Sequence, residues 1–193
     1  MKKAVLFLFV LLCLVFSVHA NAQAVQKEIK VALDGPLEVP GKSLSAGKYV
    51  ITREETPGHP IVKIFDGDEN KLVVTMIGIP ADLGKAPEDS MIALFETAGD
   101  NPPALRALFF RGDSVGVEFV YPSERAKTLA KESGENVMAA DNATSPNPSE
   151  EPTPEQLQTM REDVVMVITP EGQSVSMPES GQSTERAKPS EKY

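Results

Sequence analysis

The stretch IVKIFDGDENKLVVTMIGIP, residues 61–80, predicts a β-hairpin and with it the class of the fold. Two runs rich in valine and isoleucine flank a short polar segment, residues 66–70, made of Asp, Gly, Glu and Asn. β-Branched residues favour strands, and Asp, Gly and Asn favour the tight turns that join antiparallel strands. The sequence therefore predicts antiparallel pairing near the centre of the chain.

Short segments of the same kind continue on both sides of this hairpin. Apolar and polar residues alternate in residues 29–33, 49–53 and 115–121, which places the apolar side chains of each segment on one face. Turn-forming residues at 34–36 and 99–103 separate such segments. About seven or eight strands with no helix between them predict a mainly β fold, a compact antiparallel β-sandwich or barrel.

One short C-terminal helix is predicted to follow these strands, over residues 124–131. Ser123 is the expected N-cap and Gly134 the expected C-cap. The small and apolar residues that share one face of this helix are Ala126, Leu129 and Ala130. We expect that face to pack on the sheet.

The composition changes after this helix. The formal net charge of the chain is −9, and loss of Lys2 and Lys3 with a signal peptide would make it −11, of which −7 lies in residues 133–193. Low hydrophobicity with high net charge cannot bury enough apolar surface to offset the entropy of ordering. We expect a β-rich domain at residues 23–137 and a mostly disordered acidic tail at 138–193, in which residues 163–177 can form a β-hairpin.

The first 22 residues have the pattern of a cleaved secretory signal. Lys2 and Lys3 precede the apolar run 4–18, and Ala-Asn-Ala at 20–22 fits a signal peptidase site. The run is shorter than the roughly 20 residues of a membrane span. It also contains Cys13, the single cysteine. We expect an exported, periplasmic or secreted protein with no thiol and no stable membrane span after cleavage.

A calcium loop is one interpretation of the turn at residues 66–70. Asp66, Asp68 and Asn70 match its first ligand positions, D-x-D-x-N. Lys71 and Ile77 stand where the EF-hand pattern needs glycine and an acidic residue. We therefore favour a plain hairpin turn, keep weak calcium binding as the alternative, and expect no cofactor.

Catalytic candidates are few. His59 is the only histidine after residue 22, and no recognised nucleophile motif accompanies it. One histidine without cysteine gives no basis for a zinc site. Glu96 and Glu118 are candidates for paired carboxylates, although solvent-facing strand positions explain both. The chain carries no phosphate-binding motif and no basic cluster suited to nucleic acid. We expect no enzymatic activity.

The tripeptide Arg111-Gly112-Asp113 is the adhesion signal that many animal cell-surface receptors recognise. Strand-like segments stand on both sides of it, and Gly followed by Asp favours a tight turn. We favour a hairpin turn here and keep receptor binding as the alternative.

Three segments resemble small secreted proteins of uncharacterised function from Gram-negative bacteria. They are LEVPGKSLSAGKYVI (37–51), FDGDENKLVVTMIGIP (65–80) and ALRALFFRGDSVGVEFVYPSERAKTLAKESGENV (104–137). The similarity covers roughly residues 35–137, and its most specific part is G-x-E-F-V-Y-P-x-x-R-A-x-x-L-A at 116–130. The resemblance implies location, architecture and a variable turn position at Arg111, and it implies no site residues.

Together these features favour a non-enzymatic binding or accessory module of the cell envelope, whose partner would be an envelope protein or glycan. One alternative is a small exported hydrolase or carbohydrate-active enzyme that uses His59, Glu96 or Glu118. The other is an adhesin that uses the turn at residues 111–113.

Overall fold

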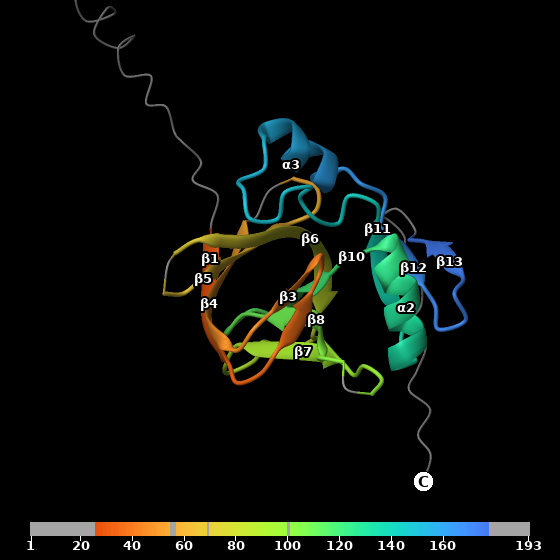
Figure 1. Ribbon diagram of the computed structural model, residues 1–193, viewed down its shortest axis with the longest axis horizontal. Coiled ribbons are helices and arrows are strands. Elements are labelled where there is room, and N and C mark those ends of the chain that lie inside the picture. The colour runs from red at the N-terminus through yellow and green to blue at the C-terminus, as the bar shows by residue number, and fades with distance from the viewer. Residues whose placement is uncertain (1–25, 55–56, 69, 100, 178–193) are drawn as a thin grey trace, which may run out of the picture.

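A computed structural model describes residues 26–54, 57–68, 70–99 and 101–177. These residues form one large sheet, one small sheet and two helices (Figure 1). The prediction of a mainly β fold is confirmed. Residues 1–22, with the expected signal peptide and Cys13, lie outside the described residues. Within the described ranges, neither helix has the length and apolar character that a membrane crossing requires.

The large sheet holds nine strands and curls round on itself, so that its interior is seen end-on in Figure 1. In chain order β1 to β9 span Gln26–Leu33, Leu37–Val39, Lys42–Leu44, Gly47–Glu54, Ile61–Asp66, Leu72–Asp82, Met91–Phe95, Ala104–Phe109 and Val115–Phe119. Neighbours run β1-β4-β5-β6-β9-β8, and both β7 and the β2–β3 hairpin pair with β8. The predicted hairpin at residues 61–80 is confirmed as β5 and β6.

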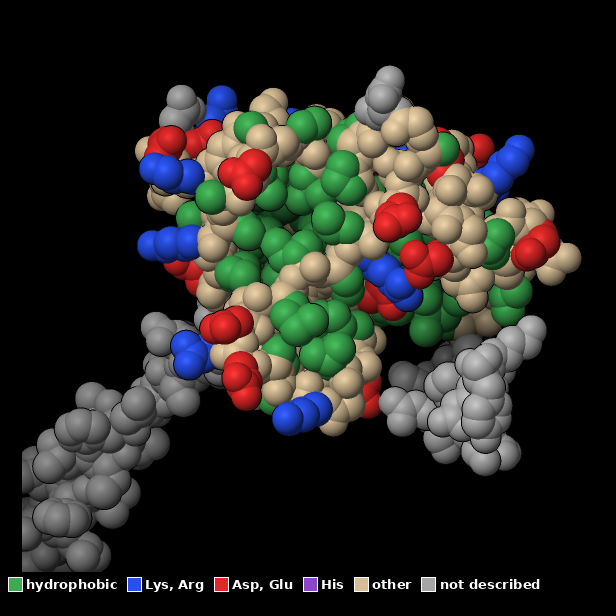
Figure 2. Space-filling view, turned by 90° about the horizontal axis from the view of Figure 1, so that it is seen from below, with side chains coloured by type: hydrophobic (Ala, Val, Ile, Leu, Met, Phe, Trp, Pro, Cys, Tyr) green, Lys and Arg blue, Asp and Glu red, His purple; other side chains and the backbone are tan. Residues whose placement is uncertain are grey.

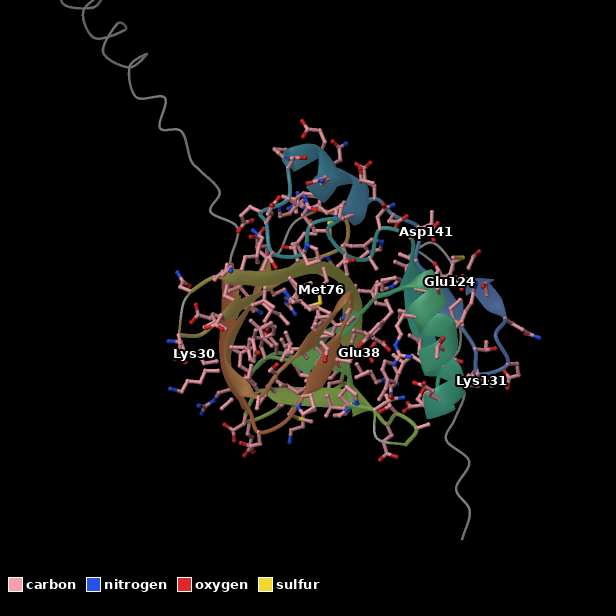
Figure 3. The ribbon with its side chains drawn as sticks, in the orientation of Figure 1. Lys30, Glu38, Met76, Glu124, Lys131 and Asp141 are labelled. Carbon is pink, nitrogen blue, oxygen red and sulfur yellow. The ribbon has the colours of Figure 1, made fainter. Side chains whose placement is uncertain are left out.

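The curled sheet encloses one apolar core. Met76 lies inside it, whereas Lys30 points outward from β1 (Figure 3). Aromatic side chains fill much of the interior, and the rings of Phe95 and Tyr121 meet edge to face with centroids 6.4 Å apart. The largest fully buried side chains of this core include Tyr121, Phe95, Phe119, Ile64, Met76, Leu105, Leu108 and Leu129.

The predicted helix is confirmed as α2, Ser123–Ser133, with Ala126, Leu129 and Ala130 buried on one face. Gly134 ends it as expected, in a left-handed conformation with φ 71°, and its N–H donates to the carbonyl of Ala130. The predicted N-cap is wrong. Pro122 occupies the N-cap position, and the Ser123 hydroxyl instead lies 2.9 Å from Oδ1 of Asp141. Pro122 sets the extended conformation that precedes the helix, and Ser123 becomes its first residue.

The small sheet extends the domain past residue 137, where the sequence analysis ended it. Its strands β10, β11, β12 and β13 span Tyr121–Pro122, Val137–Ala140, Met166–Ile168 and Ser174–Ser176. The expected hairpin within 163–177 is β12 and β13, and β12 pairs with β11. The described part of the predicted tail, residues 138–177, is therefore folded. Residues 178–193 lie outside the described residues.

Contacts with the large sheet explain why composition misjudged this segment. Helix α3, Pro154–Arg161, begins with a capping box formed by Thr153 and Gln156. Met160, which is 2% exposed, packs in a second apolar cluster that also contains residues of β5 and β6. Lys63 of β5 forms an ion pair of 2.9 Å with Glu151. Burial alone would lower the pKa of Lys63, but hydrogen bonds and charge from Glu151 and Glu54 outweigh it and raise that pKa.

Candidate functional site

The candidate calcium loop has the geometry of a turn. The backbone N–H of Asp68 donates to Oδ1 of Asp66 over 2.9 Å, and the N–H of Asp66 donates to the carbonyl of Lys71 over 2.8 Å. Asn70 has a left-handed φ of 51°, which asparagine tolerates better than most residues. Outside the masked positions, which include Glu69, no group of three or more His, Cys, Asp or Glu side chains is arranged to hold a metal. Turn formation explains these residues.

The three catalytic candidates lie on three different elements. His59 belongs to the loop before β5. Its backbone N–H donates to the carbonyl of Arg161, and its ring atom Nε2 lies 2.9 Å from the carbonyl of Asp163. These contacts of His59 connect the C-terminal end of α3 and the segment after it to the loop before β5. Glu96 is exposed just after β7, and Glu118 is half-buried in β9.

Glu118 belongs to a charged cluster in which the guanidinium of Arg106 forms ion pairs with two carboxylates. Nε of Arg106 lies 3.7 Å from Oε1 of Glu118, and Nη1 of Arg106 pairs with Glu135. The guanidinium also lies over the ring of Phe95 at 5.4 Å. Burial raises the pKa of Glu118, while the charge and hydrogen bond of Arg106 oppose that rise. The arrangement joins β8, β9 and the segment after α2.

We expect Glu118→Gln to become more stable relative to the wild type as pH rises from about 4 to about 7. A carboxyl group whose folded pKa lies above its unfolded pKa contributes most stability at low pH, and loses that contribution as pH rises through the folded pKa. Glutamine does not titrate. Urea unfolding of both proteins at several pH values measures the difference, and a difference that stays constant or falls would contradict this assignment.

The residues Arg111-Gly112-Asp113 form the turn between β8 and β9, as predicted. Gly112 has a φ of 79°, and its N–H donates to the carbonyl of Pro87 over 3.0 Å. The N–H of Asp113 donates to the carbonyl of Phe110, which closes the turn. The Asp113 carboxylate is paired with Lys27 of β1. The aspartate is thus engaged within the protein, as a structural turn residue would be.

Residues of the motif at 116–130 make close contacts with β8 and with β2. Gly116 passes so close to β8 that a Cβ at this position would lie 2.4 Å from the carbonyl oxygen of Leu108. The Tyr121 hydroxyl donates to the carbonyl of Leu105 over 2.8 Å, and burial raises the pKa of Tyr121. Arg125 of α2 binds Glu38 of β2 through two bonds of 2.6 and 2.7 Å. These contacts are structural, and none of them forms a ligand site.

A site that no sequence pattern indicated lies where the two ends of the curled sheet meet. The strand order β1-β4-β5-β6-β9-β8 divides at β8, which pairs both with β2 of the β2–β3 hairpin and with β7. The branch through β7 begins with β1 and ends with β7. In the described part of the chain, β1 pairs only with β4 and β7 only with β8. We call the line along which β1 and β7 face each other the seam.

An apolar groove of about 550 Å³ lies at the seam. Its apolar walls come from β1, from the turn after β1 and the start of β2, from β7 and from the segment before β8, and they include Val31, Leu33, Leu37, Ile92, Leu94 and Pro102. Leu94 remains 43% exposed. Figure 2 shows apolar side chains gathered on the face that carries β7. Among the described residues that line the groove, Asp34, directly after β1, is the only charged one.

The opposite end of the seam is closed by contacts between β1, β4 and the turn after β8. Lys27 of β1 pairs with Asp113. The guanidinium of Arg53 in β4 lies over the ring of Phe110 at 5.1 Å, and its Nη1 lies 3.4 Å from the carbonyl of Val115. The seam is therefore held together beside the N-terminal end of β1 and forms the groove beside its C-terminal end.

Comparison with protein-family models, with curated proteins and with solved structures finds no match to this chain. The resemblance to small secreted bacterial proteins therefore stays a prediction.

Proposed function

We propose that this chain is a non-enzymatic binding module, exported to the cell envelope, that holds its ligand in the groove at the seam. The observation that carries the proposal is an apolar groove placed between two strands whose second edges have no strand partner within the described ranges. The expectation of export rests on the signal pattern of the first 22 residues.

The size and lining of the groove suit a ligand site. Small-molecule and cofactor pockets commonly enclose about 300–1,000 Å³ and combine apolar walls with a few polar groups. Here Leu33, Ile92 and Leu94 supply apolar wall, and Asp34 supplies one charge. An exposed apolar surface of this kind costs free energy in water, and a ligand that covers it recovers that free energy.

The positions of the catalytic candidates also favour binding over hydrolysis. His59, Glu96 and Glu118 lie on separate elements, and none of them lines the groove. His59 and Glu118 already hold structural contacts, with Asp163 and Arg106 respectively.

Binding of the neutral apolar dye Nile red tests the proposal. Leu94 lines the groove, whereas Leu83 is similarly exposed at 38% and lies outside the lining. We expect Leu94→Asp to weaken dye binding roughly tenfold or more, since it replaces an apolar contact by a charge. Leu83→Asp is the matched control and should change the affinity less than about twofold.

Thermal unfolding of both variants verifies that each protein is folded, since exposed positions tolerate polar substitution. Equal dye affinity of the two variants, or no dye binding by the wild type, would remove the groove as the site.

A further inference from the structure

We infer that the groove takes a single extended peptide strand of a partner protein, which inserts between β1 and β7 and runs antiparallel to both. The inference rests on the proposed function, because it names the class of ligand for the same groove. Strand direction, unpaired backbone groups and charge each support it.

Strand direction follows from the pairing of the sheet. The path β1-β4-β5-β6-β9-β8-β7 contains six successive pairings, all antiparallel. An even number of reversals leaves β1 and β7 running in the same direction. The groove agrees, because it is lined by Leu33 near the end of β1 and by Leu94 near the end of β7. One added strand of opposite direction would give eight strands in continuous antiparallel order around the curled sheet, a number that side chains alone can fill.

Backbone hydrogen bonding favours a peptide over other apolar ligands. Each edge strand presents a row of N–H and C=O groups, and in the described ranges neither β1 nor β7 has a strand partner on its second edge. A lipid chain or a compact apolar molecule could cover the apolar walls but could not bond these groups. An extended peptide does both, since main-chain bonds hold it to the edges and alternate side chains enter the groove. We therefore expect a peptide with apolar residues at every second position.

The charge of the groove predicts which kind of group lies at the N-terminal end of the bound peptide. Asp34 follows the last residue of β1, Leu33, and is the only charged residue of the lining within the described ranges. A strand antiparallel to β1 begins where β1 ends, so its N-terminal end lies beside Asp34. A basic residue or a free amino group is favoured there. The C-terminal segment of this chain, PESGQSTERAKPSEKY at 178–193, lacks the apolar alternation that the groove requires.

The test uses the chain from residue 23 on, which keeps every described residue. The probe is a synthetic peptide of five residues, the length of β7, that starts with lysine and continues with alternating valine and threonine, so that it fits the open part of the seam. Two matched controls carry N-methyl groups on the odd or on the even residues. Successive N–H groups of a strand point to opposite edges, so each control removes the bonds to one neighbour only.

We expect the unmodified peptide to bind and to displace Nile red, and both methylated peptides to lose at least tenfold in affinity. Tolerance of one methylated set would show addition to a single edge and would overturn the insertion. Dye binding without peptide binding would also overturn the inference while leaving the proposed function intact. Failure of both dye and peptide to bind would remove the inference and the proposed function together.

The direction of the bound peptide relative to β1 is measured by a separate experiment. A nitroxide at the peptide N-terminus should broaden the amide signal of Leu33 more strongly than that of Lys27, which lies six residues, about 20 Å, away along β1. Stronger broadening at Lys27 than at Leu33 would overturn the antiparallel assignment. Asp34→Asn should weaken the peptide that starts with lysine by about two- to fivefold and leave an acetylated peptide without lysine unchanged. Equal affinities of the two peptides for both proteins would contradict the role of Asp34.

Discussion

Gly116→Ala is expected to destabilise the domain by about 3 kcal/mol or more, because the added methyl group has no space. It would stand 2.4 Å from the carbonyl oxygen of Leu108 and 2.4 Å from Cδ1 of Phe109. Leu108 pairs with Val117 in the ladder between β8 and β9, so its carbonyl cannot retreat without opening that ladder. Chemical denaturation measured by circular dichroism gives the loss.

Gly35→Ala is the matched control for this substitution. A Cβ at Gly35 meets no heavy atom within 4 Å, so the same added methyl should change the free energy of unfolding by less than about 0.5 kcal/mol. Equal stability of the two variants would show that β8 and β9 do not approach as closely as described.

Tyr121→Ala is expected to cost about 3–5 kcal/mol, the range for removing a large buried aromatic side chain. Tyr121 is fully buried, meets Phe95 edge to face and donates a hydrogen bond to Leu105. It also stands at the start of β10 of the small sheet, between β9 of the large sheet and α2. Its loss would therefore leave a cavity at the junction of the two sheets and remove the hydrogen bond to the carbonyl of Leu105. Urea denaturation measures it.

Tyr121→Phe separates the hydroxyl from the ring. At neutral pH we expect a smaller loss of about 1–2 kcal/mol, because only the bond to Leu105 is removed. Burial raises the folded pKa of Tyr121 above its unfolded value, so the stability that the tyrosine contributes falls as pH rises above about 10. The deficit of the phenylalanine variant should shrink between about pH 9 and pH 11. A deficit that grows over this range would contradict the buried hydroxyl.

Local sequence patterns predicted the strands and α2, because residues close together in the sequence determine where these elements form. The turn at residues 66–70 and the alternation of residues 115–121 each lie within one hairpin or strand. The buried face of α2 follows from a spacing of three and four residues, which any helix would display. The G-x-E-F-V-Y-P motif also indicated residues that matter. The structure assigns them to packing, with Gly116 and Tyr121 as the clearest cases.

The folded segment at 138–177 and the groove could not be predicted because their causes are distant in sequence. Composition classed that segment as unable to fold alone, yet Met160 and Val165 are buried in a cluster with residues of β5 and β6. The groove exists because the sheet curls until β1 and β7, some 60 residues apart in the chain, line the same groove. Within its own segment of the sequence, each of Val31 and Leu94 is an apolar residue of a β-strand, and nothing in that segment indicates that the two line one groove.

Hydrogen exchange of the backbone amides, measured with and without the alternating peptide, tests the central claim most directly. We predict slower exchange at β1 and at β7 together, because the inserted strand would bond both edges. Exposed β13 ends the small sheet and should exchange unchanged, which makes it the internal control. Unchanged exchange at β1 and β7 in the presence of saturating peptide, or slowing confined to β13, would contradict the claim that the seam is the binding site.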